Sequence, residues 1–422
     1  MTVAPPSETL APAAIAPPPR AARRGRIWLW LLSALVLVSL VRVLTGAHEL
    51  TSSGTLRQAL IAAIPIAMAG LGGLWSERTG IINIGLEGMM ILGALGAGYF
   101  TYYYGIWIGL LGALLFGAIG GLIHALATVT FGVDHIVSGV AITIMATGVA
   151  AFLAEAYFSG LPGGGPTQSP TLDTPPTITV PGVSDWLLEV QSRHWFLVSD
   201  VASAMRALVW EMSVVTLLAV ALVIGSGWLL WRTRFGLRLR SCGESPSAAE
   251  TLGVNVYLYK FVAVTASGGF AGLGGAYLVL VASSGYQNGI VGGRGYIGLA
   301  ANIFGNWRPG GLFMGSTLFG YTEGLHLRPG SGLSIHALLL LVAICLLVLA
   351  ALQVRRAQMV PGAVSFVASV GFFAWFMLSD EIPADFTGMT PFVTTILVLA
   401  LASQRLRVPA TIGMSYRRGQ AG

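Results

Sequence analysis

Two carboxylates, an arginine and an asparagine lie close together within residues 76–90, in a region that is otherwise apolar. These side chains are Glu77, Arg78, Asn83 and Glu87. An ionisable side chain near the bilayer centre costs about 2.5–3.5 kcal/mol on insertion scales, so such residues usually face a bundle interior. Several glycines loosen any helix here, and broken backbone at membrane depth must be buried in protein or line a cavity. The stretch therefore predicts part of a translocation path.

The asparagine and the second carboxylate have the spacing of a binding face. Asn83 and Glu87 are four residues apart, which puts them on one side of a helix if the backbone stays helical. An asparagine amide both donates and accepts hydrogen bonds. The alternative is that Glu87 pairs with Arg78 or caps a half-helix. Glu77 and Arg78 are expected to hold the break together rather than to contact a substrate.

Other polar residues in apolar runs predict structural roles. Asp134 stands at a helix start, where it suits a capping position. His124 and His336 have no metal partner at ligand spacing, so hydrogen-bonded interior histidines are expected. Glu323 faces a pore or pairs with His326, and the sequence leaves both open.

Composition defines the class that must position these residues. The 422 residues are 55% hydrophobic and only 9% charged, with a mean hydropathy of +0.77, whereas soluble domains are about 25% charged. We predict an all-α polytopic membrane protein with ten to twelve transmembrane helices. The net charge of +6 sits in short clusters between apolar runs, which follows the positive-inside rule and argues against a nucleic-acid partner. Cys242 and Cys345 fall in different environments, so neither a disulfide nor a metal site is expected.

A span needs about 20 apolar residues, and twelve stretches approach that length. The candidates are 27–45, 56–75, 85–104, 106–130, 136–158, 212–231, 260–282, 296–307, 311–326, 335–353, 362–378 and 389–403. The stretch 296–307 is too short to cross unaided, which leaves the exact number open.

Charge and apolar runs together predict one membrane domain with polar connections. Residues 1–26 are expected to form a disordered cytoplasmic tail, followed by a transmembrane permease domain over 27–403 and a cytoplasmic tail over 404–422. The basic segment 232–260 is predicted to be a cytoplasmic loop. The Pro-rich segment 159–210 is predicted to be an external, extended loop.

Within the external loop, a group of aromatic and leucine residues predicts a short helix on the membrane surface. Its residues are Trp186, Leu187, Leu188, Trp195 and Phe196. A docking surface for an extracytoplasmic partner and a loop that only covers helix ends are both open.

The two halves of the chain show a faint internal repeat. Residues 56–158 and 260–353 each have a full span, a Gly-rich polar break, a compact pair and another span. The breaks run from Ser76 to Gly88 and from Ser283 to Arg308. The copies start from opposite sides of the membrane, so we predict an inverted repeat with interrupted helices, a pattern typical of transporters.

A short cytoplasmic helix is predicted between two spans. Ser245 suits the cap position and Pro246 the first helical position, while Gly253 suits a left-handed stop. So short a helix is marginal in water alone, and its small residues suit a partner's groove. Packing on its own membrane domain is the alternative. The predicted coupling residues are Ser245, Pro246, Ala248, Ala249, Glu250 and Gly253.

Four motifs carry a resemblance to a known family. They are Gly72-Gly-Leu-Trp-Ser-Glu-Arg-Thr-Gly-Ile-Ile-Asn-Ile-Gly-Leu-Glu-Gly-Met-Met90, Gly243-Glu-Ser-Pro-Ser-Ala-Ala-Glu-Thr-Leu-Gly-Val254, Gly292-Gly-Arg-Gly-Tyr-Ile-Gly-Leu-Ala-Ala-Asn-Ile-Phe-Gly-Asn-Trp-Arg-Pro-Gly310 and Arg407-Val-Pro-Ala-Thr-Ile-Gly-Met-Ser-Tyr416. Over roughly residues 55–416 the chain resembles permease subunits of ATP-binding cassette (ABC) importers of the nucleoside branch. That branch is related to the permeases for ribose-type sugars and branched-chain amino acids.

The resemblance implies a multi-pass subunit of a prokaryotic cytoplasmic membrane, and the distribution of basic residues predicts that both termini lie inside. The resemblance also implies a second homologous permease subunit, ABC ATPase subunits and an extracytoplasmic substrate-binding lipoprotein as partners. The chain has no Gly-x-x-x-x-Gly-Lys-Ser/Thr phosphate loop. It is therefore expected to be no enzyme and to need no cofactor, with ATP bound by the partner ATPase.

With a nucleoside as the implied substrate, five residues are predicted to bind it. Asparagine amides match base edges and ribose hydroxyls, and aromatic rings stack on bases, which is worth ~1–3 kcal/mol in nucleic-acid complexes. The predicted substrate-binding residues are Asn83, Glu87, Asn302, Phe304 and Trp307. The alternative is that Glu87 caps a half-helix and that the aromatic rings pack in the core or against lipid.

Three other functions are weighed against this one. An ABC permease for a sugar or a branched-chain amino acid differs from it by few side chains. An ion-coupled secondary transporter would use Glu87, Glu323 or His124 as a proton site. A membrane enzyme is disfavoured because the sequence contains no constellation of nucleophile, base and metal.

Overall fold

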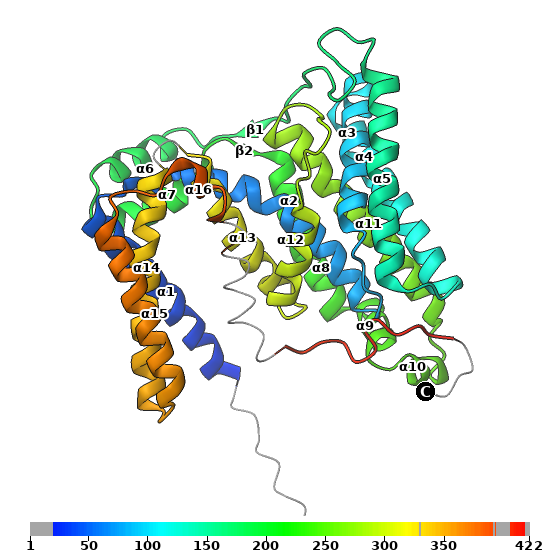
Figure 1. Ribbon diagram of the computed structural model, residues 1–422. Coiled ribbons are helices and arrows are strands. Elements are labelled where there is room, and N and C mark those ends of the chain that lie inside the picture. The colour runs from blue at the N-terminus through cyan, green and yellow to red at the C-terminus, as the bar shows by residue number, and fades with distance from the viewer. Residues whose placement is uncertain (1–19, 329–330, 391–392, 394–405, 418–422) are drawn as a thin grey trace, which may run out of the picture.

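The computed structural model describes residues 20–328, 331–390, 393 and 406–417 as an almost entirely helical protein (Figure 1). Among these described residues, seven helical segments are long and apolar enough to cross a membrane. They are Ser53–Glu77, Ile106–Thr130, His135–Phe158, Val214–Arg232, Val256–Ala282, Ser331–Arg355 and Met359–Leu378. The predicted helical, polytopic architecture is confirmed.

The elements divide into two halves with a connecting region between them. The first half contains α1 (Arg20–Thr45), η1 (His48–Thr51), α2 (Ser53–Glu77), α3 (Leu86–Tyr104), α4 (Ile106–Ala125), η2 (Leu126–Thr130) and α5 (His135–Phe158). The connecting region contains β1 (Thr177–Ile178), α6 (Val183–Ser192), α7 (Val198–Val209) and β2 (Met212–Ser213), with the two strands paired antiparallel. The second half contains α8 (Val214–Arg232), α9 (Arg234–Glu244), α10 (Pro246–Thr251), α11 (Val256–Tyr277), η3 (Leu278–Ala282), α12 (Arg294–Phe304), α13 (Pro309–His326), α14 (Ser331–Arg355), α15 (Met359–Leu378) and α16 (Ala384–Thr387).

In the core of the molecule, helices of each half pack against one long helix of the other half. In the first half, α3 and α4 pack against α11, and in the second half α12 and α13 pack against α2. Close approach depends on missing side chains: a Cβ on Gly268 of α11 would lie 2.2 Å from the Gly117 carbonyl oxygen of α4. Small residues let membrane helices meet backbone to backbone. The long helices α2 and α11, against which these helices pack, therefore have the largest buried share of the seven spans.

A second group of helices stands to one side of this core. α14 packs along α15 and also against α1, and Figure 1 shows the three side by side at the left of the view. Only 11% of the α15 span is buried, against 83% of the α2 span. Because α15 is apolar all round and little covered by protein, its outer surface suits lipid.

The short elements gather at opposite ends of the bundle. α6 and α7 lie at one end, and α9 and α10 lie at the other (Figure 1). The C-terminal segment 406–417 runs along α9 and α10: the Thr411 amide and hydroxyl both donate to the Gly243 carbonyl oxygen, at 3.0 and 2.8 Å.

Most predicted boundaries agree with these helices. Each predicted span from 27–45 to 362–378 overlaps a helix, including 296–307, which corresponds to α12. Asp134 caps α5 as predicted, since its carboxylate accepts from the amides of Ile136 and Val137. The last predicted span, 389–403, falls almost entirely outside the described residues.

Two expectations were wrong in detail. α1 begins at Arg20, within the 1–26 segment expected to be disordered, of which residues 1–19 lie outside the described residues. The 159–210 loop is not merely extended, because it contains α6 and α7. Trp186 belongs to α6 as expected for a short helix, but Trp195 and Phe196 lie in the turn that follows.

Candidate functional site

The first carboxylate of the 76–90 stretch, Glu77, is the last residue of α2 and is 3% exposed. Its Oε2 accepts hydrogen bonds from Asn302 Nδ2 at 2.8 Å and from the indole N–H of Trp307. The neighbouring guanidinium of Arg78 donates to the Trp307 carbonyl oxygen, at 3.0 Å from Nε and 2.5 Å from one terminal nitrogen. The end of α2 is thus bonded to the end of α12 and the turn that follows it. Glu77 and Arg78 hold the break together, as predicted.

The second carboxylate, Glu87, lies in the first turn of α3 and faces the start of α12. Its Oε1 accepts from the Gly293 amide and its Oε2 from the Gly295 amide, both at 2.8 Å. A helix N-terminus offers unpaired N–H groups and a positive dipole end, so a carboxylate is stabilised there. A Cβ on Gly295 would lie 2.6 Å from the Glu87 Cα, so only glycine permits this approach. The half-helix cap, rather than a pair with Arg78, is the role that this structure gives Glu87.

Asn83 lies between the two carboxylates in the coil that joins α2 to α3. Its Nδ2 donates to the Ser267 hydroxyl of α11 at 2.9 Å, and the residue is fully buried. Its Oδ1 has no hydrogen-bond partner among the described residues, and the same holds for Oδ1 of Asn302. Buried polar groups are nearly always paired. Two spare acceptors at the junction of the two halves therefore call for an explanation.

The structure divides the five predicted substrate-binding residues into groups. Asn302 and Trp307 meet at Glu77, whereas Glu87 contacts the other end of α12. Asn302 is seven residues beyond Gly295, which is about 10 Å along a helix at 1.5 Å per residue. Phe304 packs against Phe319 of α13, with ring centroids 5.7 Å apart. Side-chain contact with a substrate stays a prediction for all five.

Several residues of this region escaped the sequence analysis. Ser267 positions Asn83 but looks like one more small residue in a glycine-rich helix. Arg294 pairs with Glu323, which answers the open question about that carboxylate. His326 bonds the Thr387 hydroxyl instead, at 2.8 Å. Arg294 lies within a quoted motif, but its partner is 29 residues away in the chain, so no local spacing reveals it.

The interior histidine of α4 is hydrogen-bonded, as predicted. His124 Nδ1 lies 2.9 Å from the Ser138 hydroxyl of α5, and Nε2 lies 3.0 Å from the Ile82 carbonyl oxygen in the α2–α3 coil. Both ring nitrogens therefore have partners. His124 of α4 therefore hydrogen-bonds both α5 and the coil that contains Asn83.

The predicted coupling helix is present as α10, a single six-residue segment. Pro246 occupies its first turn and Gly253 follows it at φ +80°, as predicted. The capping role of Ser245 was wrong: its side chain makes no cap hydrogen bond, although its carbonyl oxygen accepts from the Ala249 amide at 3.0 Å. Its backbone angles, φ −154° and ψ 88°, differ from the φ −62° and ψ 145° of Ser52, which does cap its helix.

The two faces of α10 differ sharply. Ala249 is buried against Cys242 and Val256, and burial raises the pKa of the Cys242 thiol to about 11. The outward side carries Ala248, and beyond it Leu252 is 84% exposed. Glu250 accepts a hydrogen bond from the Tyr416 hydroxyl.

The α9–α10 region touches the polar break directly. A Cβ on Gly243 would lie 2.3 Å from the Arg78 carbonyl oxygen. The C-terminal segment adds two more bonds: the Gly413 amide donates to the Gly80 carbonyl oxygen at 2.9 Å, and the Arg407 amide donates to Asn306 Oδ1 at 2.7 Å. The α9–α10 region is therefore linked by short contacts and hydrogen bonds to the residues that follow Glu77.

A many-helix membrane bundle with buried polar breaks and an exposed knob at one end has the features of a transport subunit. Residues 55–349 match the family described as branched-chain amino acid transport system / permease component, and the chain belongs to that family. The family's members are permease components, so the chain is a multi-pass membrane transport subunit and not an enzyme.

Several relatives resemble much of the chain. The guanosine ABC transporter permease protein NupQ of Bacillus subtilis is 37% identical over 274 residues, which are 63% of this chain and 79% of the relative. The nucleoside ABC transporter permease protein NupC of Lactococcus lactis is 31% identical over 366 residues, 85% of this chain and 94% of the relative. A putative glucose ABC transporter permease protein of Haloferax volcanii is 31% identical over 373 residues, 87% of this chain and 98% of the relative.

Proposed function

We propose that this chain is a permease subunit of an ATP-driven ABC importer that carries nucleosides across the cytoplasmic membrane. The observation that carries the proposal is the agreement of two relatives, a guanosine and a nucleoside permease, over 63% and 85% of the chain. ATP is bound and hydrolysed on partner ATPase subunits. An extracytoplasmic lipoprotein delivers the substrate, and a second homologous permease completes the path.

The spare acceptors support nucleoside recognition at the junction of the halves. Oδ1 of Asn83 and Oδ1 of Asn302 accept nothing among the described residues. A nucleoside offers N–H and O–H donors that match them. Both atoms are buried, so they meet substrate when the halves separate during alternating access. In this proposal Glu87 and Trp307 position the path, and Phe304 offers an aromatic face.

A sugar is the second candidate substrate, because the relative from Haloferax volcanii is named as a putative glucose permease. A hexose shares hydroxyl donors with ribose but has no base. Uptake in a strain that carries the complete transporter, competed by unlabelled nucleosides, glucose and branched-chain amino acids, distinguishes the substrates. We expect nucleosides alone to compete; competition by glucose alone would reject the nucleoside assignment.

We propose an inverted repeat of α2–α5 and α11–α14. The packing between the halves supports this repeat, since α3 and α4 pack against α11 in the way that α12 and α13 pack against α2. The order of helices agrees with a cytoplasmic N-terminus and twelve crossings, when the short α12 and residues 389–403 are counted. The bond between Thr411 and Gly243 supports an even number of crossings, because it requires the C-terminal segment to share a side with α9 and α10.

We propose that α10 is the site where the ATPase acts. Its exposed side ends at Leu252, and its bonded neighbours lead to Glu77 and Arg78. Leu252→Arg is the sharper test than a change at Ala249, because Ala249 is buried and its replacement would disturb the fold. Burying an unpaired charge in the ATPase interface costs more than about 1.4 kcal/mol, so uptake should fall by about tenfold or more.

The matched control for that variant is Gln358→Arg, an exposed residue in the turn between α14 and α15 whose side chain makes no cap hydrogen bond. It adds the same charge without touching α10. Both variants should insert at the wild-type level. Normal uptake by Leu252→Arg would reject coupling through this helix.

The substrate site is tested by comparing Asn83→Ala with Ser267→Ala. If Asn83 contacts the nucleoside, losing it should raise KM by about tenfold, the effect of removing roughly 1.4 kcal/mol of hydrogen bonding. Ser267→Ala removes only the support of the amide and should have a smaller effect. Equal effects of the two variants would limit Asn83 to a structural role.

A further inference from the structure

The helix α7 has its polar side turned toward the protein and its apolar side turned outward. Buried positions carry polar side chains: Ser199, Asp200, Ser203 and Arg206. Exposed positions carry apolar ones: Val198, Val201, Met205 and Leu208, each between 42% and 59% exposed. The spacing of three, four and three residues sets the exposed group along one stripe of the helix. A helix covering a protein in water has the opposite arrangement.

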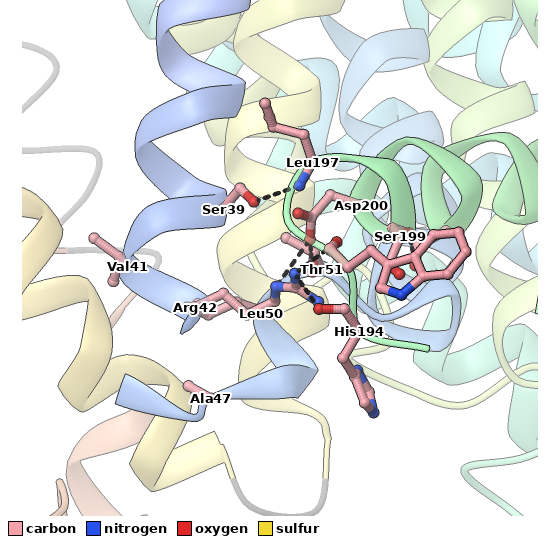
Figure 2. A network of polar contacts seen from close by, with 12 residues as sticks. Ser39, Val41, Arg42, Ala47, Leu50, Thr51, His194, Leu197, Ser199 and Asp200 are labelled. Atoms are coloured by element: carbon pink, nitrogen blue, oxygen red, sulfur yellow. Dashed lines mark hydrogen bonds and ion pairs between the residues drawn. The ribbon is translucent and has the colours of Figure 1, made fainter. Parts of the chain in front are cut away.

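The inward side is fastened by buried polar bonds. Asp200 forms an ion pair with Arg42 of α1, at 3.2 Å from Nε, and accepts from the Thr51 hydroxyl at 2.5 Å (Figure 2). Nearly two turns further on, the Arg206 guanidinium donates to the Ser53 hydroxyl at 2.7 Å. These bonds fix the rotation of α7 about its own axis, so its apolar stripe faces outward.

The turn before α7 is bonded to the last two turns of α1. The Arg42 guanidinium donates to the carbonyl oxygens of His194 and Trp195, at 3.4 and 3.2 Å, and the Leu197 amide donates to the Ser39 hydroxyl at 3.0 Å (Figure 2). This sets the start of α7 at the depth of residues 39–42, a few ångströms inside the end of α1 at 1.5 Å per residue.

The outward surface of α1 at that depth is itself apolar. Leu40, Val43 and Leu44 are 40–64% exposed there. A helix with an exposed apolar surface is lipid-facing in a multi-pass membrane protein. The stripe of α7 therefore lies at the same depth as an exposed apolar surface of α1.

The same turn is strained and presents two aromatic residues. His194 and Leu197 have φ of +51° and +63°, values that non-glycine residues adopt at a cost. Between them, Trp195 and Phe196 are 51% and 46% exposed, and the Arg193 guanidinium lies 5.1 Å from the Trp195 ring. Tryptophan is enriched where membrane proteins meet the boundary between acyl chains and headgroups.

From these observations we infer that α7 lies in the bilayer boundary at the α6–α7 end of the molecule. Its apolar stripe contacts lipid acyl chains, and Trp195 sits at headgroup level. The buried bonds to Arg42 supply the polar side with partners that lipid cannot offer. The inference concerns a lipid contact and does not depend on which solute the permease carries.

Site-directed spin labelling of the assembled transporter in phosphatidylethanolamine and phosphatidylglycerol nanodiscs tests the inference. Val201→Cys and Met205→Cys are made in a chain with Cys242→Ala and Cys345→Ala, and Glu189→Cys on the exposed side of α6 is the matched control. Labels on the stripe should collide with oxygen more often than with a water-soluble nickel chelate, and the control label should show the reverse order. Nickel-dominated collisions at 201 and 205 would overturn the inference.

A photo-crosslinking measurement covers the case in which the cysteine-free chain does not fold. A benzophenone amino acid replaces Met205, or Glu189 as control, in the otherwise native chain. Lipid adducts at 205 and not at 189 support the inference. Adducts to the substrate-binding lipoprotein or to a second permease at 205, in place of lipid, would overturn it and identify a protein interface.

Discussion

The short helices α7 and α10 lie at opposite ends of the molecule and are held in opposite ways. α7 is fixed by charged side chains buried against α1 and α2, and it turns an apolar stripe outward. α10 is fixed by backbone geometry, with Pro246 at its start and Gly253 after its end, and it buries Ala249. An apolar outer surface suits lipid, whereas a small helix with one projecting leucine suits a protein groove. The two helices thus differ both in how they are attached and in the contact that we propose for each, lipid for α7 and the ATPase for α10.

The largest effect should come from breaking the buried ion pair of α7. Asp200→Leu leaves Arg42 buried without its carboxylate, which costs about 3–5 kcal/mol. Thermal unfolding in nanodiscs and hydrogen exchange of the α7 amides should both show the loss. The double variant Arg42→Met/Asp200→Leu removes both charges and should recover most of it. Wild-type stability of Asp200→Leu would contradict the proposed attachment.

A smaller effect is expected at the end of α10. At φ +80°, Gly253→Ala incurs roughly 1–2 kcal/mol of left-handed strain. Local opening near Gly253 should therefore become roughly 5–30-fold more frequent, measured by exchange of the Val254 amide, which donates to the Ala249 carbonyl oxygen. Gly225→Ala in α8 is the control, because its Cβ meets nothing within 4 Å and helical alanine is favoured. Equal exchange in both variants would argue against a backbone-held helix.

Next in size is the cap of the helix that follows α10. Asn255 accepts from the Leu258 amide at 3.2 Å at the start of α11. Replacing such a cap by alanine costs about 1 kcal/mol, so exchange of the Leu258 amide should accelerate about fivefold in Asn255→Ala. No acceleration would mean that the side chain contributes nothing at this helix start.

The smallest effect is expected at Ser245, although the residue type suggests a cap. Its side chain makes no capping bond, so Ser245→Ala should change exchange of the α10 amides by less than twofold, well below the ~1 kcal/mol of an ordinary cap. A loss comparable to that of Asn255→Ala would show that α10 depends on a side-chain cap after all.

Much of the fold was predictable because membrane helices reveal themselves locally. The apolar runs 106–130 and 136–158 match α4–η2 and α5 to within one residue. Pro246 and Gly253 were correctly read as helix boundaries because their backbone preferences are local. Ser245 misled because capping depends on the conformation of the preceding chain, which its residue type does not specify.

The candidate site was predictable only as a set of residues. The break from 76 to 90 stood out because charges are costly in an apolar region. Their partners did not: Glu77 bonds Asn302 and Trp307, which lie 225 and 230 residues away. The sequence also did not reveal that α7 buries its polar side and exposes its apolar side, because an amphipathic pattern does not show which side faces the protein.

The sequence by itself determined that this protein crosses a membrane many times and which short stretches interrupt the apolar helices, because water and lipid act on each segment separately. Only the tertiary structure decided that Glu87 caps α12, that Oδ1 of Asn83 and Oδ1 of Asn302 accept no hydrogen bond from the described residues, and that α7 turns its valines outward. Those outcomes depend on which helices pack together, and packing joins residues that no local pattern relates.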